Sequence, residues 1–295
     1  MRAMNITQAL ARFLTQLEAD GRSQLTIGQY RRHVQLLATW AKHEGLSGDL
    51  LTFSSDVLAR FLCSAEACKG PTGRPKKASS VNVLRASIKG LFGYLHLAGI
   101  IRSDPSRLIR RARCGAPPPR GLSEAEQERL MGVLEQGEGV KAERDHVLFG
   151  LMLFAGLRIG AALSLDATDV NLERCELRVR ITKGDQPRTV LIGPRAVQVL
   201  GPHMEQYPIG PLFRGANGDA LTARHAQRRF KLWAERAEIR EVASTHSLRH
   251  SFAMGLYQRT GDLGIVQRAL GHRSIASTLV YAQADDERLR DALTH

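Results

Sequence analysis

The sequence of 295 residues is poor in cysteine and contains no long apolar run. Its cysteines, Cys63, Cys68, Cys114 and Cys175, form no CxxC pair and no spacing typical of a disulfide framework, so we expect reduced thiols. A helix that crosses a membrane needs about eighteen apolar residues, and the first residues lack the apolar centre of a signal peptide. We therefore expect a cytoplasmic protein with no membrane partner.

Acidic residues are scarce in the first part of the chain only. Residues 1–120 contain 19 Lys and Arg against 7 Asp and Glu, whereas residues 121–295 contain 23 against 22. A basic region beside a nearly neutral one indicates a surface that binds a polyanion, next to a domain with another task. Charge alone favours two interpretations equally: binding of nucleic acid, and a basic surface that only keeps the protein soluble.

Apolar periodicity predicts a helical first domain over residues 1–112. One of its helices opens at Thr26, which has capping-box spacing to Gln29, and places Val34, Leu37 and Trp40 on one face. Residues 113–121 include three consecutive prolines, which favour an extended chain, and are the predicted linker.

The second domain, residues 122–295, is predicted to be mainly helical with one β-hairpin. Ser123 and Glu126 have capping-box spacing, and residues 146–156 are apolar on nearly every side, as in a helix inside a core. The remaining predicted elements are strands 176–181 and 188–193 and helices near 222–238, 247–259, 262–270 and 274–282. The predicted fold class is mainly α with a small antiparallel β-sheet.

Several basic side chains could contact a phosphate backbone. They occur in the Gly- and Pro-containing segment 69–77, in the arginine-rich run before the linker, and on the helix near 222–238 that also carries Arg224, Arg229 and Lys231. The candidates for contact with a nucleic acid are Arg74, Lys76, Lys77, Arg110, Arg111 and Arg228. A solvated charged surface explains these residues equally well.

Six residues of the second domain form a chemically coherent set: Arg158, Lys183, His246, Arg249, His272 and Tyr281. Taken singly, each has a more ordinary explanation, such as an ion pair, a helix cap or a packed ring. Together, two arginines can bind the oxygens of a phosphodiester and stabilise its transition state, and a histidine can accept a phenol proton. No carboxylate, His or Cys ligand cluster is evident, so we expect no metal and no cofactor.

The order Arg, Lys, His-x-x-Arg, His, Tyr resembles that of the tyrosine recombinases, the phage-integrase family. The matching motifs are GLRIG (156–160), HSLRH (246–250), LGH (270–272) and the nine-residue step from His272 to Tyr281. In the first domain, TIGQYRRHVQLLATW (26–40) and SDPSRL (103–108) resemble the family's helical core-binding domain. One position departs from the family pattern, because Ala161 stands where an acidic residue is usual.

The resemblance implies an enzyme that cuts and rejoins DNA. Tyr281 would attack a scissile phosphate and form a 3′-phosphotyrosine and a free 5′-hydroxyl. Arg158 and Arg249 would bind the phosphoryl oxygens, His246 would be the acid/base group, and His272 would donate a hydrogen bond to the phosphate.

The same resemblance implies that Lys183 protonates the leaving oxygen and that no ATP is needed. The implied partners are double-stranded DNA with a specific recombination site and three further copies of the chain, as a homotetramer on two sites, associated with the nucleoid. The sequence identifies no accessory protein. Two alternatives remain open: a type IB topoisomerase with the same chemistry, and a catalytically silent DNA-binding protein on the same scaffold.

Overall fold

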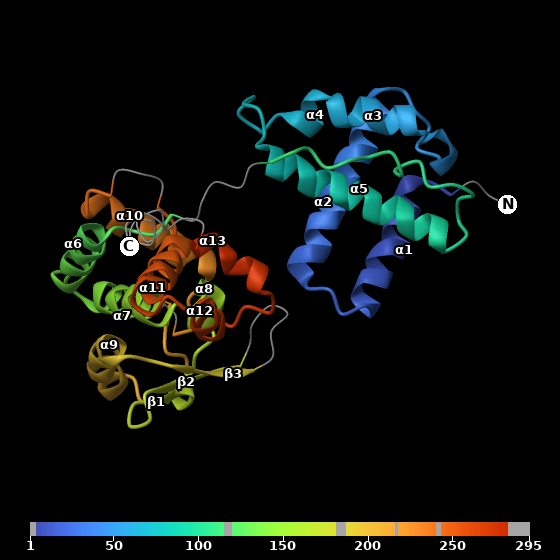
Figure 1. The fold of residues 1–295 in the computed structure, drawn as a ribbon. Helices are drawn as coiled ribbons and strands as arrows, with labels where there is room; N and C mark the ends of the chain where they lie inside the picture. Colours follow the sequence, from blue (N-terminus) through green and yellow to red (C-terminus); the bar gives the residue numbers. More distant parts are fainter. Residues whose placement is uncertain (1–3, 115–119, 181–186, 216–217, 240–242, 283–295) are drawn as a thin grey trace. The chain divides into compact units, whose positions relative to one another are not determined.

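The computed structural model describes residues 4–114, 120–180, 187–215, 218–239 and 243–282. The chain divides into two compact units, Met1–Ala116 and Pro117–His295 (Figure 1). Each unit has its own hydrophobic core. The linker over residues 113–121 stays a prediction, because residues 115–119 lie outside the described residues. No helix in the described ranges is both long enough and apolar enough to cross a membrane.

The first unit is built of helices. Helices α1, α2 and α5 pack on one another, and α3 and α4 pack against α2 (Figure 1). The predicted inward positions Val34, Leu37 and Trp40 are buried in the core, together with Phe61 and Phe92. The elements of this unit are α1 (Ile6–Ala19), α2 (Gln24–His43), η1 (Leu50–Thr52), α3 (Ser55–Cys63), α4 (Ala65–Cys68) and α5 (Ala78–Leu97).

The predicted capping box of Thr26 and Gln29 is wrong. Helix α2 begins at Gln24, and Ser23 is its N-cap residue. The Ser23 Oγ accepts a hydrogen bond from the backbone N–H of Thr26, 3.3 Å away. Thr26 is therefore already the third residue of the helix, because a serine three positions earlier satisfies its N–H.

The second unit is also mainly helical, as predicted. The capping box of Ser123 and Glu126 is confirmed, and so is the buried helix, which extends over α7 and ends at Gly156 in a left-handed conformation. The helices are α6 (Glu124–Glu135), α7 (Val140–Ala155), α8 (Ile159–Leu163), η2 (Ala167–Asp169), α9 (Pro194–Gln206), α10 (Ala223–Arg236), α11 (Thr245–Thr260), α12 (Leu263–Leu270), η3 (Ile275–Ser277) and α13 (Leu279–Ala282).

One small antiparallel sheet has the order β1 (Val170–Asn171), β2 (Glu176–Val179), β3 (Arg188–Leu191). Leu177 of β2 pairs with Val190 of β3, and both side chains face the core of the unit. The predicted hairpin is confirmed for these strands, and the fold class is mainly α with a small antiparallel sheet. Residues 181–186 between them, including Lys183, lie outside the described residues.

The predicted helix over 274–282 is wrong in one respect, because it is two short elements. Ser274 caps the first, η3, by accepting a hydrogen bond from the N–H of Ala276. The N–H of Thr278 then bonds to the carbonyl of Ile275 at 2.7 Å, which tightens this turn to a 3₁₀ helix. The second element, α13, carries Tyr281.

Candidate active site

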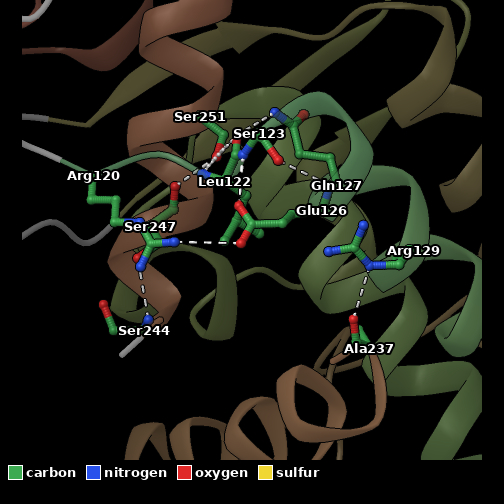
Figure 2. Close-up of polar contacts among 10 residues, drawn as sticks. All are labelled: Arg120, Leu122, Ser123, Glu126, Gln127, Arg129, Ala237, Ser244, Ser247 and Ser251. Atoms are coloured by element: carbon green, nitrogen blue, oxygen red, sulfur yellow. Dashed lines mark hydrogen bonds and ion pairs between the residues drawn. The ribbon is translucent and has the colours of Figure 1, made fainter. Parts of the chain in front are cut away.

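Helix α11 carries three of the polar side chains of the candidate site. His246, Arg249 and His250 lie three and four residues apart, so they share one face of the helix. An adjoining face of α11 contacts the segment just before α6. There the Leu122 N–H donates a hydrogen bond to Ser251 Oγ at 2.7 Å (Figure 2). The Ser251 hydroxyl also lies 2.9 Å from the carbonyl of Ser247. These buried contacts hold the first two turns of α11 in place.

The turn that presents Arg158 follows α7. Gly156 ends this helix with φ of 64°, a conformation that glycine adopts without strain. A Cβ at this position would overlap the ring of Phe252 on α11, so the close approach also requires glycine. Leu157 is buried, and Arg158 is the N-cap residue of α8. The structure thus places Arg158 where the chain leaves the buried end of α7.

Arg249 connects this turn to the end of α12. Its side chain is buried, with an exposed fraction of 3%. Nη1 donates to the carbonyl of Gly156 at 2.6 Å, and Nη2 donates to the carbonyl of Leu270 at 2.9 Å. Both carbonyls end helices and would otherwise lack a helical donor. One guanidinium therefore positions the Arg158 turn and the segment that begins with Gly271 and His272.

His246 lies in a positive environment. Burial lowers the pKa of His246, and the charges of Arg249 and Arg158 lower it further. The imidazole is therefore neutral near pH 7 and has one nitrogen able to accept a proton. Arg249 lies three residues from His246 on the same face of α11, and the charge of Arg158 also acts on this histidine.

Tyr281 packs into the same region of the second unit. Its side chain is 3% exposed and lies in a small cluster with Ala253, Val266 and Leu270. Burial raises the pKa of the Tyr281 phenol, and Arg249 and then Arg158 act in the opposite direction. The phenol is consequently protonated at neutral pH and requires a proton acceptor before it can act as a nucleophile.

The sequence-based prediction missed His250. Its Nδ1 lies 3.0 Å from the Tyr281 hydroxyl, and the two ring centroids are 5.7 Å apart. His250 also neighbours His246, with ring centroids 6.1 Å apart. Burial lowers the pKa of His250, and His246 and Arg249 lower it further. The signal available in the sequence was the spacing of His246 and His250, which puts both rings on one side of α11.

His272 is held by the segment that leads to Tyr281. Its Nδ1 lies 2.9 Å from Thr278 Oγ1, and Thr278 is fully buried. The His272 carbonyl accepts a hydrogen bond from Gln267 Nε2 at 3.0 Å. His272 is therefore oriented by Thr278, three residues before Tyr281, and follows the carbonyl that Arg249 binds.

The stem of the hairpin that carries Lys183 reaches the same segment. Arg188, at the start of β3, places Nη1 at 3.4 Å from the carbonyls of Arg268 and Ala269, at the end of α12. A Cβ at Gly271 would meet this guanidinium, which would have to shift, and the positive φ of 63° also favours glycine there. Lys183 itself is outside the described residues, and its placement in the site stays a prediction.

Ala161, which stands in place of the acidic residue usual in the family, is buried in α8 with an exposed fraction of 6%. It belongs to the main core of the second unit. In this chain the position contributes apolar packing.

The six candidates for DNA contact differ in what they already bind. Arg74, Lys77, Arg110, Arg111 and Arg228 are exposed. Lys76 is half-buried, and its Nζ donates to the carbonyls of Glu66 and Ala67 at 2.7 and 3.1 Å. On α10, Arg229 forms an ion pair with the buried Asp145 at 2.6 Å, so its guanidinium contacts the core of the unit.

The described part of the site brings together a phenol, two neutral imidazoles and two guanidinium groups. Guanidinium groups suit the oxygens of a phosphodiester, and a phenol beside a neutral imidazole suits nucleophilic attack. Within the described residues, no three His, Cys, Asp or Glu side chains are grouped so that they could hold a metal ion.

The family models that match the chain are the phage integrase family, over residues 120–288, and the phage integrase N-terminal SAM-like domain, over residues 10–99. The tyrosine recombinase XerD of Ralstonia nicotianae is 31% identical over 293 residues, which cover 96% of this chain and 92% of XerD. The tyrosine recombinase XerC of Vibrio parahaemolyticus is 31% identical over 294 residues, covering 98% and 92%.

Solved structures have the same fold. The XerH site-specific recombinase, in a post-cleavage complex with a palindromic difH substrate, has a TM-score of 0.75 at 26% identity and covers 95% of this chain and 84% of that one. A lambda integrase tetramer bound to a Holliday junction has a TM-score of 0.73 at 17% identity, over 94% of this chain and 78% of that one. The matches to family models and relatives span both units, and the chain therefore belongs to the phage-integrase family of tyrosine recombinases.

Proposed function

We propose that this tyrosine recombinase cleaves and rejoins DNA at a specific recombination site, with Tyr281 as the nucleophile. One observation carries the assignment: the buried Tyr281 hydroxyl lies 3.0 Å from a histidine and in the positive field of Arg158 and Arg249. A phosphodiester bound to these arginines would lie where the phenol can attack it. The reaction is a phosphoryl transfer. Its catalysis comes mostly from positioning the phosphate and the nucleophile and from stabilising the charge of the transition state.

In the proposed reaction, the Tyr281 oxygen attacks the scissile phosphorus, and the bond to the 5′ oxygen breaks. The products are a 3′-phosphotyrosine and a 5′-hydroxyl. Arg158 and Arg249 bind the non-bridging oxygens, His246 acts in proton transfer, and His272 donates a hydrogen bond to the phosphate. The contacts of Arg249 support these roles. Its guanidinium binds the carbonyl of Gly156, just before Arg158, and the carbonyl of Leu270, just before His272.

Lys183 is proposed to donate the proton that the leaving 5′ oxygen requires. The contact of Arg188 with the end of α12 supports this role, because it holds the stem of the Lys183 hairpin against the His272 segment. The phosphotyrosine retains the energy of the broken bond, so attack by a 5′-hydroxyl rejoins the strand without ATP.

We propose double-stranded DNA as the partner of both domains. The core-binding domain (1–112) would contact the phosphate backbone through its exposed basic residues, joined by the linker (113–121) to the catalytic domain (122–295). The XerH complexes with difH and the lambda integrase tetramer on a Holliday junction support a homotetramer acting on two DNA sites. The chain would then act in the cytoplasm, on DNA of the nucleoid.

The test uses a nicked DNA duplex that carries the recombination site found in the DNA flanking the gene. A nick beside the scissile phosphate lets the short 5′-hydroxyl fragment leave, which traps the covalent complex. We expect the wild-type chain to give a covalent protein–DNA band on a denaturing gel, and Tyr281→Phe to give none. Tyr207→Phe, which removes a phenol hydroxyl outside the site, is the matched control and should behave as wild type.

The other outcomes identify the alternatives. Salt-sensitive DNA binding without a covalent band in any variant would contradict the proposal and favour a silent DNA-binding protein. A covalent band together with relaxation of supercoils, and no recombination between two sites, would favour a topoisomerase.

A further inference from the structure

The hydroxyl of Tyr281 has a defined partner that the proposed roles leave unused. Within the described residues, this hydroxyl bonds to His250 Nδ1 at 3.0 Å and not to His246. A general base must lie within hydrogen-bonding reach of the proton that it removes, about 2.6–3.2 Å between heavy atoms. His250 meets this geometric condition on the reacting oxygen.

The protonation state of His250 is also suitable. Burial, His246 and Arg249 all lower the pKa of this imidazole, so it is neutral near pH 7. With its proton on Nε2, the ring has a lone pair on Nδ1 that can accept from the phenol. The two rings pack in a tilted arrangement, with an interplanar angle of 57°.

The charge of a bound substrate would increase the basicity of His250. In the free protein, His246 and Arg249 disfavour an imidazolium at His250, and the charge of Arg158 acts on the neighbouring His246 and Tyr281. A phosphodiester bound to these arginines adds negative charge, which favours protonation of a nearby imidazole. His250 would thus become a better proton acceptor when the phosphate is in place.

We propose that His250 is the general base that removes the proton of Tyr281 during strand cleavage. The phenol O–H bond breaks, its electron pair forms the new O–P bond, and the proton moves to His250 Nδ1. The bond from phosphorus to the 5′ oxygen breaks, and that oxygen takes a proton from a different donor. In rejoining, the imidazolium of His250 returns its proton to the departing phenolate. The inference rests on the proposed role of Tyr281. It assigns different roles to the two histidines: His250 contacts the nucleophile, and His246 lies in the field of the two arginines.

The first test is His250→Asn, which keeps a polar side chain but removes the base. With saturating protein and the nicked duplex, we expect the rate of covalent complex formation at neutral pH to fall by about 10²-fold, within the range for loss of a general base. The rate should rise with pH, because hydroxide then removes the proton. DNA affinity should stay unchanged. His146→Asn on α7, another half-buried histidine whose pKa burial lowers, should match wild type.

The second test replaces Tyr281 with 3,5-difluorotyrosine, whose phenol is more acidic and needs a base less. In His250→Asn this change should restore most of the lost rate, whereas in His246→Asn it should not. A side chain that only supports the fold of the site would give no such rescue. His250→Gln, checked for thermal unfolding and DNA binding, repeats the test with a longer amide.

Two results would overturn the inference. An unrescued loss would show that His250 acts only by packing, and a faster cleavage in His250→Asn would show that its hydrogen bond withholds the nucleophile. Failure of the proposed function is separate, because it would show as no covalent band in wild type or as a persisting band in Tyr281→Phe.

Discussion

Within the described residues, the first unit buries no charged side chain, whereas the second unit buries several. The buried polar residues of the first unit are Asn82, Ser87 and Ser106. Those of the second unit include Arg144, Asp145, Asp169 and Arg249. The first 120 residues nevertheless carry most of the net positive charge of the chain. The two units therefore use charge differently.

In the first unit, charges at the surface produce a field that attracts phosphates without fixing their position. In the second unit, buried charges hold parts of the chain in register. Asp145 binds Arg229 and the indole N–H of Trp233, which joins α7 to α10. Asp169 binds Arg178 and Arg180 at β2. Precise geometry, which phosphoryl transfer requires, comes from the unit that buries its charges.

Among the changes to charged residues, the largest effect is expected from Arg249→Lys. If the buried charges of the second unit serve to position the chain, a side chain with the same charge but another shape should not support cleavage. A lysine cannot bind the carbonyls of Gly156 and Leu270 together, so the Arg158 turn and the His272 segment lose their common anchor. We expect covalent complex formation to fall by about 10³-fold, as for loss of a main transition-state donor.

The matched control is Arg129→Lys on α6, whose Nε donates to the carbonyl of Ala237 at 3.2 Å. It is exposed and lies outside the site, so we expect cleavage within about twofold of wild type, as is usual for surface substitutions. An Arg249→Lys chain with near wild-type cleavage would show that charge alone suffices, and would break the comparison.

Asp145→Asn should lower the free energy of unfolding and change DNA binding less. The fully buried Asp145 neutralises the neighbouring Arg144 and the half-buried Arg229. Removing one partner of a buried ionic cluster leaves uncompensated charge, which costs about 3 kcal/mol in the free energy of unfolding. Urea denaturation followed by tryptophan fluorescence would measure it, because Trp233 belongs to the cluster.

The control for this change is Glu235→Gln, whose partner Lys231 lies 3.7 Å away on the exposed side of α10. An exposed pair of this kind contributes about 0.5 kcal/mol at most. Equal losses in the two variants would mean that burial of Asp145 adds nothing, contrary to the comparison.

The parts of the fold that follow from periodic or local sequence patterns were predictable. Apolar periodicity identified the buried face of α2 and the central α7, and local spacing identified the cap at Ser123. The helix over 274–282 was not predicted correctly, because the break depends on Thr278, whose hydroxyl bonds to His272 rather than to its own helix. Periodicity contains no information on such a contact.

The candidate site was predictable where its residues follow a known motif order. His250 was missed because its contact with Tyr281 joins residues 31 positions apart and depends on how α13 packs on α11. The bond of Arg229 to Asp145 joins α10 to α7 in the same way. Both required tertiary structure, since neither pair is adjacent on one helix face.

The smallest effect is expected in the first unit, where adjacent lysines have different environments. Lys77 is exposed and has no side-chain hydrogen bond to the helix that it caps, whereas Lys76 binds the carbonyls of Glu66 and Ala67. If Lys77 contacts a phosphate, Lys77→Gln should reduce the slope of log affinity against log salt by about 1. Fluorescence anisotropy with labelled duplex at several salt concentrations would measure the slope.

Lys76→Gln should change that slope less and should instead lower stability by about 1 kcal/mol, because hydrogen bonds to backbone carbonyls are lost. The adjacent positions give a matched pair with the same change in charge. Equal changes in slope would show that the field of the whole domain matters and the individual contact does not. A larger change for Lys76 would mean that DNA draws its ammonium away from α4, so that even the first unit uses a charge for positioning.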